Sequence, residues 1–218
     1  GDQPPAPDHR GRRSFAASGL TSHPMKVLVL SPYPESLNQI LASSGDDSVV
    51  CEMPITETSP EPSAFGLAVS YGYRHLIRGD VLDAWQNRLI NLHVSMLPWN
   101  RGADPNFWAA HDGTPGGVSI HYIDAGIDTG DLIAQQEIPF QEGDTLASSY
   151  DRLQRRMIEL FRDTWPSIRA GTAPRIKQQG EGSHHRARDK DDLMAKLPLG
   201  WETPVAEVAR LAHQDIER

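Results

Sequence analysis

The chain has 218 residues, a formal net charge of -8 and a single cysteine, Cys51. This length suits one domain of ordinary size with a short appendage. The negative charge argues against a nucleic-acid-binding surface, one cysteine excludes an internal disulfide, and no apolar run approaches the ~20 residues of a membrane span. The composition therefore predicts a cytoplasmic protein that binds neither nucleic acid nor membrane.

The first half of the chain alternates predicted strands and helices. Residues 1–24 are rich in proline and glycine and poor in large aliphatic residues, which predicts a disordered arm or a tag. Buried strands are expected where apolar residues run without alternation, and short helices where they recur at helical spacing. The expected elements are a strand at 26–30, a helix at 35–42, strands near 49–53 and at 65–70, and a helix at 80–87.

The second half continues this pattern and ends in two helices. A strand is expected at 88–93, a helix from Pro105 to about His111 capped by Asp104, and strands at 118–123 and 132–139. A long helix at 144–170, capped by Asp144, and a closing helix at 203–216 follow. The order predicts an α/β fold with a mostly parallel sheet, helices on both faces and a short C-terminal extension.

Three polar residues lie at the ends of predicted strands, where an α/β sheet presents its ligands. Asn91 and His93 are two residues apart, so a strand points both side chains to one side. Transfer of an acyl group to an amine requires an oxyanion donor and a path for the proton. Asn91 suits the first role. Asp128 would pair with His93, favour its imidazolium and receive the proton, which makes these three the candidate catalytic residues.

Two segments are candidates for the walls of a binding pocket. The glycine-bearing loop 124–130 includes Asp124, Gly126 and Asp128, and its backbone could approach a flat heterocycle. An ordinary Asp/Gly turn is an equal alternative for Asp124. Residues 70–73 follow another strand and could form the second wall of the same pocket, through Ser70, Tyr71, Gly72 and Tyr73.

The run 91–98, with Arg101-Gly102 and then 124–130, resembles the 10-formyltetrahydrofolate-dependent formyltransferases. The resemblance covers about residues 65–139, and residues 97–108 are most similar to the small sugar N-formyltransferases. It implies a Rossmann-like catalytic domain, here 25–180, followed by an extension at 181–218. It also implies that Asn91, His93 and Asp128 form the catalytic trio and that the folate donates the formyl group.

The same resemblance indicates the acceptor and the partners. It implies a small-molecule amine, a nucleotide-linked amino sugar of the kind used in lipopolysaccharide synthesis. Trp99, Arg101 and Asn106 would contact this acceptor, although packing against the sheet is the default expectation for Trp99. A homodimer is expected from the family. The stretch between residues 30 and 65 is too short for two complete β/α units, and the stretch after Gly171 is too short for a large second domain that would hold tRNA.

Two other functions remain compatible with these residues. His93, His121 and Asp128 could form a two-histidine, one-carboxylate metal site in a hydrolase, whereas the formyltransferase reading requires no metal. A catalytically silent module that binds folate or a nucleotide is the third reading.

Overall fold

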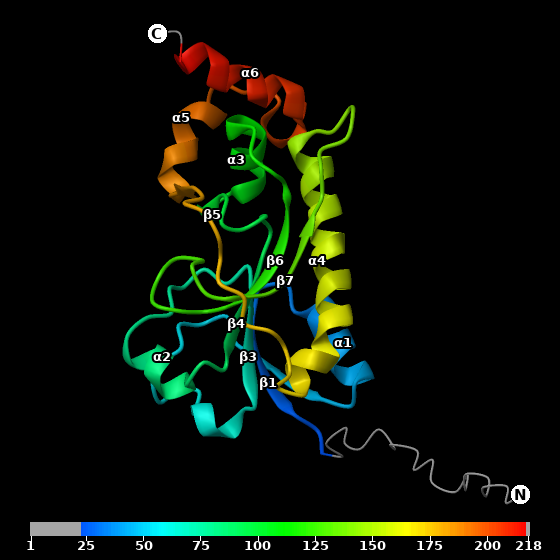
Figure 1. Cartoon of the computed structure of the whole chain (residues 1–218), viewed down its shortest axis with the longest axis vertical. Coiled ribbons are helices and arrows are strands. Elements are labelled where there is room, and N and C mark those ends of the chain that lie inside the picture. Colours follow the sequence, from blue (N-terminus) through cyan, green and yellow to red (C-terminus); the bar gives the residue numbers. More distant parts are fainter. Residues whose placement is uncertain (1–22, 217–218) are drawn as a thin grey trace, which may run out of the picture.

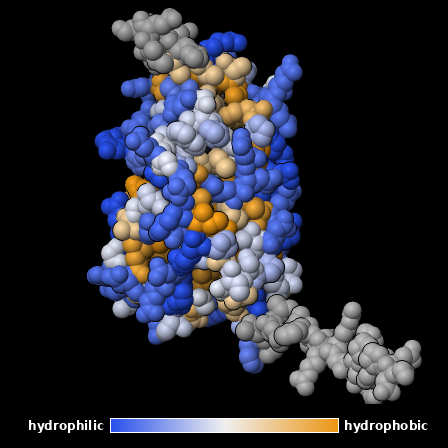
Figure 2. Space-filling model, viewed as in Figure 1, coloured by the Kyte–Doolittle hydropathy of each residue, from blue (hydrophilic) through white to orange (hydrophobic). Residues whose placement is uncertain are grey.

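The computed structural model describes residues 23–216, and the side chains only as far as residue 212. Nearly all of the predicted N-terminal arm, 1–24, therefore lies outside the described residues. Within the described part, no helix is both long and apolar enough to cross a bilayer. The face in Figure 2 is mostly hydrophilic, with its apolar areas separated from one another.

A six-stranded mixed sheet forms the centre of the molecule (Figure 1). Its strands lie in the order β2-β1-β3-β4-β6-β7. The first four are parallel, and β6 and β7 are each antiparallel to the preceding neighbour. The strands are β1 (Lys26–Leu30), β2 (Asp47–Val50), β3 (Leu67–Tyr71), β4 (Leu89–His93), β6 (Gly117–Tyr122) and β7 (Leu132–Glu137).

Helices cover both faces of this sheet, as predicted. Helices α1 (Glu35–Ser43) and α4 (Leu146–Arg169) lie against one face, where Phe161 and Trp165 are fully buried (Figure 1). The short helix α2 (Asp80–Trp85) covers the other face, where its Trp85 is buried in one core cluster with Leu28 and Leu89. Because strand residues alternate between the two faces, each strand contributes to both cores.

A smaller layer extends beyond one end of the sheet (Figure 1). It contains α3 (Pro105–Asp112), α5 (Asp191–Met194), α6 (Val205–Ile216) and a two-stranded ladder of β5 (Arg101–Gly102) with β8 (His184–His185). Its apolar centre is formed by Phe107, Trp108, Leu146, Leu197 and Val208. The 3-10 helices are η1 (Pro62–Ala64), η2 (Ala187–Lys190) and η3 (Gly200–Glu202). Pairing with β5 brings the predicted extension onto the rest of the fold.

The short stretch before β3 completes the sheet with one β/α unit only. After β1 and α1 the chain forms the edge strand β2, and the following residues contain only η1 before β3. Strand β2 spans 47–50 rather than 49–53, because its register with β1 starts at Asp47.

Asp104 is the N-cap residue of α3 with Pro105 after it, as predicted, but its side chain does not cap the helix, and the prediction that Asp144 caps α4 is wrong. Asp104 makes no side-chain cap bond; its backbone is left-handed and its carboxylate pairs with Lys190 Nζ at 2.6 Å. Asp144 precedes the actual cap of α4, Thr145, whose hydroxyl accepts from the backbone N–H of Ser148 at 3.1 Å. The Asp144 carboxylate instead binds the Arg152 guanidinium at 2.5 and 2.8 Å.

Candidate active site

Strand β4 presents Asn91 and His93 on the same face of the sheet. Its residues Ile90 and Leu92 belong to the core under α1 and α4, whereas Leu89 belongs to the core under α2. Since side chains alternate along a strand, Asn91 and His93 share the face of Leu89. The predicted spacing argument therefore holds in the structure.

Asp128 meets both residues from a loop that follows β6. Its Oδ1 accepts a hydrogen bond from Asn91 Nδ2 at 3.2 Å, and its Oδ2 accepts from the backbone N–H of Gly102 at 2.9 Å. Oδ2 also lies 3.7 Å from His93 Nδ1, which is too long for a direct hydrogen bond. The structure thus brings the three candidate catalytic residues to one place.

His121 belongs to this cluster, although the sequence singled it out only as a metal ligand. It lies opposite Asn91 in the β4–β6 ladder, and its side chain is buried. Its Nδ1 lies 2.8 Å from the backbone carbonyl of Tyr122, so Nδ1 carries the proton. The bare Nε2, 3.3 Å away, then accepts from Asn91 Nδ2. No three His, Cys, Asp or Glu residues within the described chain are arranged to hold a metal ion.

Burial decides the charge of His93 but not that of Asp128. It lowers the pKa of His93 by more than the facing Asp128 carboxylate raises it, so His93 is neutral near neutral pH. Asp128 does favour the imidazolium, as expected, but burial of the ring outweighs this effect. Burial also opposes ionisation of Asp128, but His93, His121 and the Gly102 N–H together hold the pKa of Asp128 well below its usual range.

The tautomer of His93 follows from its other nitrogen. Nε2 lies 3.2 Å from the carbonyl oxygen of Asn100, which can only accept, so Nε2 carries the proton. The Nδ1 lone pair then faces Asp128. The site therefore presents an anionic carboxylate beside a neutral imidazole, and both can take a proton from an incoming group.

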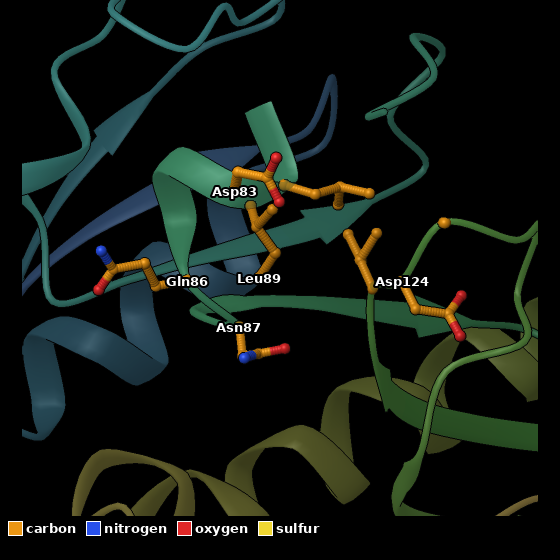
Figure 3. Close-up of a pocket in the computed structure, with 8 residues that line it drawn as sticks. Asp83, Gln86, Asn87, Leu89 and Asp124 are labelled. Carbon is orange, nitrogen blue, oxygen red and sulfur yellow. The ribbon is translucent and has the colours of Figure 1, made fainter. Parts of the chain in front are cut away.

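A cavity of about 420 Å³ opens on this face of the sheet (Figure 3). It lies between the end of α2, strand β4 at Leu89 and the start of the loop after β6, where Asp124 is found. The Asp124 carboxylate accepts from the Gly126 N–H at 3.0 Å and the Thr129 hydroxyl at 2.6 Å, and so fixes its own turn. The sequence reading missed Leu82, Asp83, Gln86, Asn87 and Leu89, of which Leu89 follows from its two-residue spacing to Asn91.

The residues at 70–73 do not form a single wall. Tyr71 lies in the core under α1 and α4, and its hydroxyl donates to Gln154 of α4. Tyr73 instead donates to the carbonyl of Met53 at 2.7 Å. Ser70 is buried in β3 beside Asn91, and Gly72 turns the chain with a φ of 64°. Tyr71 therefore faces away from the Asp124 loop.

A second cavity, of about 640 Å³, lies where Tyr71 points. It is bounded by the segment after β1, the end of β3 and one side of α4. Tyr33 and Tyr150 expose their rings there, and Arg155 and Arg162 are exposed beside them. Neither arginine pairs with another residue of the described range 23–216.

The three residues expected to contact the acceptor have different surroundings. Trp99 is 38% exposed in the loop after β4. The Arg101 guanidinium binds Gln178 Oε1 through Nε at 3.2 Å and Nη2 at 2.8 Å. Asn106 is buried, and its amide donates to the Leu146 carbonyl and the Ser149 hydroxyl. The structure therefore gives Asn106 a packing role between α3 and α4.

The chain is similar to known proteins in both sequence and structure. Residues 58–164 match the model of the family described as Formyl transferase. The structure of the formyltransferase PseJ from Anoxybacillus kamchatkensis, in complex with UDP-4,6-dideoxy-4-formamido-L-AltNAc and tetrahydrofolate, is 40% identical with a TM-score of 0.81. The match covers 86% of this chain and 99% of that one. A likely sugar N-formyltransferase from Mycobacterium tuberculosis shares the fold at 24% identity and a TM-score of 0.69, over 78% of each chain.

Curated relatives carry the same family assignment. Methionyl-tRNA formyltransferase from Pelotomaculum thermopropionicum is 30% identical over 94% of this chain and 60% of its own length. The corresponding enzyme from Listeria welshimeri is 36% identical over 53% of this chain, which spans only 37% of that relative. The family model and the full-length match to a solved formyltransferase lead to one conclusion: the chain belongs to the formyl transferase family.

Proposed function

We propose that this chain is an N-formyltransferase that moves the formyl group of 10-formyltetrahydrofolate to the amine of a nucleotide-linked amino sugar. The observation that carries the proposal is the convergence of Asn91, His93 and Asp128, on the strand and the loop whose earlier residues Leu89 and Asp124 line an open cavity. The complex of the 40% identical PseJ with a UDP-linked formamido sugar and tetrahydrofolate supports this choice of donor and acceptor.

The cavity at Leu89 suits the folate. It is lined by apolar side chains together with the amides of Gln86 and Asn87 and the carboxylates of Asp83 and Asp124, a combination that can hold a flat heterocycle and bind its edge. Two strand residues span roughly 6.6 Å, so a group held at Leu89 can extend its formyl carbon along β4 to Asn91.

The residues around the formyl carbon can then take separate roles in the reaction. Asn91 donates a side-chain N–H to the developing oxyanion, an interaction typically worth about 10²–10³ in rate. Its amide is already oriented, because Asp128 Oδ1 and His121 Nε2 lie 3.2 and 3.3 Å from Nδ2 and 3.4 Å from each other, on one side of the NH₂ group. The N–H on the other side can then donate to the oxyanion.

Asp128 and His93 handle the proton. The amine nitrogen forms a bond to the formyl carbon while the bond from that carbon to N10 of the folate breaks. The amine loses one proton and N10 gains one. Asp128, which is anionic, receives the proton directly or through water, and the neutral His93 beside it provides a second acceptor. No step requires a metal ion.

The second cavity is the proposed site of the acceptor's nucleotide. The strand order reverses between β1 and β3, and ligands of open α/β sheets bind outside the carboxyl ends of the strands at such a point. The exposed rings of Tyr33 and Tyr150 can stack on a base. Arg155 and Arg162 can each bind a phosphate, whereas the carboxylates of Glu35, Asp151 and Glu159 on the same lining would repel one.

Methionyl-tRNA is the competing acceptor, because the curated relatives are methionyl-tRNA formyltransferases. The net charge of -8 disfavours a polyanion of that size. The test is a panel of nucleotide-linked amino sugars and methionyl-tRNA, each incubated with 10-formyltetrahydrofolate and the whole chain. Formylation of an amino sugar, absent in the His93→Asn variant, is expected. Formylation of the tRNA alone would overturn the choice of acceptor.

The same assay separates the other readings. A hydrolase with a metal at His93, His121 and Asp128 would lose its activity in chelator, whereas formyl transfer is expected to persist. A silent binding module would formylate nothing while still binding the folate. The homodimer stays a prediction that the mass in solution tests, and the cytoplasmic location and a role in lipopolysaccharide synthesis likewise stay predictions.

A further inference from the structure

We propose that Gln178 is a positioning residue: its side-chain amide holds the loop of Asp128 against strand β5 and thereby places the Asp128 carboxylate beside His93. The proposal rests on the proposed function, in which Asp128 receives the proton of the acceptor amine. Gln178 lies 50 positions after Asp128, beyond α4, and in a segment without regular structure.

Every hydrogen-bonding group of the Gln178 amide is used. Nε2 donates to the backbone carbonyls of Asp128 at 2.8 Å and Gly130 at 2.9 Å. Oε1 accepts from Nε and Nη2 of Arg101 at 3.2 and 2.8 Å. The residues on either side of Gln178 in the chain are exposed, whereas Gln178 itself is half-buried. One amide therefore ties the loop after β6 to strand β5.

The segment that carries Gln178 is itself fixed by contacts of the chain that follows it, up to strand β8. Gly102 and its neighbour in β5 pair with β8, and the hydroxyl of Ser183 accepts from the Asn100 N–H at 2.8 Å. Gly182 packs so closely that an added Cβ would meet the Pro98 carbonyl oxygen at 2.1 Å. The backbone that carries Gln178 is thus anchored to β5 and to the loop before it, as the support of a positioning residue requires.

Asp128 needs such support because of its backbone. Its φ is 52°, in the left-handed region that non-glycine residues rarely adopt. Strand β5 holds the residue twice: the Gly102 N–H binds the carboxylate directly, and Arg101 holds the backbone through Gln178. Without Gln178 the loop can relax toward an ordinary φ, which moves the carboxylate away from His93. A displacement of ~1 Å in a reacting group can cost about 10² in rate.

The main test compares Gln178→Met, which keeps the shape and loses all four bonds, with Gln179→Ala as the matched control. The Gln179 side chain is exposed and binds only the carbonyl of Lys177. Gln178→Met is expected to lower kcat by about 10- to 100-fold with little change in KM for either substrate, and Gln179→Ala is expected to behave as wild type. A third variant, Gln178→Glu, can still accept from Arg101 but cannot donate to the two carbonyls, so it is expected to remain impaired.

A second measurement reports the position of the Asp128 carboxylate and does not depend on formyl transfer. The groups that face the His93 ring are the Asp128 carboxylate, the His121 ring and the Asn100 carbonyl. The carboxylate raises the pKa of His93, so its displacement in Gln178→Met is expected to lower the titration midpoint of His93 in NMR, at a temperature where both proteins are folded. An unchanged midpoint with kcat within threefold of wild type would overturn the proposal, as would full activity of Gln178→Glu. If wild type transfers no formyl group, the NMR result still decides the role of Gln178.

Discussion

Replacing Asp128 with Asn changes one oxygen of the site and tests the proposed proton acceptor. The amide can keep its carbonyl oxygen toward the Gly102 N–H, which now binds Oδ2 at 2.9 Å. Its NH₂ group then occupies the place of Oδ1, opposite the NH₂ of Asn91 at 3.2 Å. Unlike the carboxylate, it can donate to His121 Nε2, which lies 3.4 Å from Oδ1 in the wild type. The substitution therefore removes one hydrogen bond and leaves the packing in place.

These contacts set the size of two separate effects. The lost hydrogen bond runs from Asn91 to a charged carboxylate and is worth about 1.5–3 kcal/mol, so the fold is expected to survive with a lower melting temperature. The anionic proton acceptor is lost, because an amide does not take up a proton near neutral pH, and only His93 remains as an acceptor. Loss of general acid–base help costs about 10²–10⁴ in rate. Activity is therefore expected to fall far more than stability.

The assay is steady-state formyl transfer together with thermal unfolding, with Asp131→Asn as the control. Asp131 lies in the same loop and loses the same charge, but its carboxylate pairs with the exposed Lys177 at 2.8 Å. Asp131→Asn is expected to be as active as wild type. A kcat of Asp128→Asn within tenfold of wild type would refute the role of Asp128.

Three further changes test the surroundings of the trio. Because burial lowers the pKa of His93, the unfolded chain binds a proton at His93 before the folded protein does, as pH falls below about 6.5. The free energy of unfolding of wild type, measured relative to His93→Asn by denaturation, should therefore decrease between about pH 7.5 and 5.5. An increase over this range would contradict the lowered pKa of His93. His121→Phe removes an acceptor of Asn91 and should lower kcat at least ~10-fold with KM unchanged, so a wild-type kcat would exclude this role. Gly102→Ala should lower both kcat and the melting temperature, because the added Cβ would lie 2.3 Å from a backbone carbonyl oxygen of β8. Gly180→Ala is the control: Gly180 has a similar φ and open space around it, so the substitution should lower the melting temperature less and leave kcat unchanged.

The predictable part of the site follows from local periodicity. Asn91 and His93 are two residues apart in a strand with apolar neighbours, so their shared face could be read from the chain. The same rule applies to Leu89. Strand β1 spans the predicted residues because five consecutive residues, four of them buried, leave little choice of boundary.

The parts that could not be predicted depend on contacts between distant segments. Tyr71 faces α4, and nothing in its neighbours indicates which side of β3 is covered by that helix. Gln178 acts on Asp128 across 50 positions, and a glutamine in an irregular segment carries no periodic signal. Asp144 has the residue type of a cap, but its pairing with Arg152 leaves Thr145 to cap α4.

The most direct measurement follows the formyl carbon itself. Donor labelled at this carbon is mixed with the chain and an amino-sugar nucleotide, and the label is located by NMR in wild type and in Asp128→Asn. The proposed reaction predicts that the label appears in a new amide on the sugar nitrogen with wild type, and at least about 10²-fold more slowly with the variant. Label that stays on the folate, or that is lost to water as formate, would contradict transfer at the site formed by Asn91, His93 and Asp128.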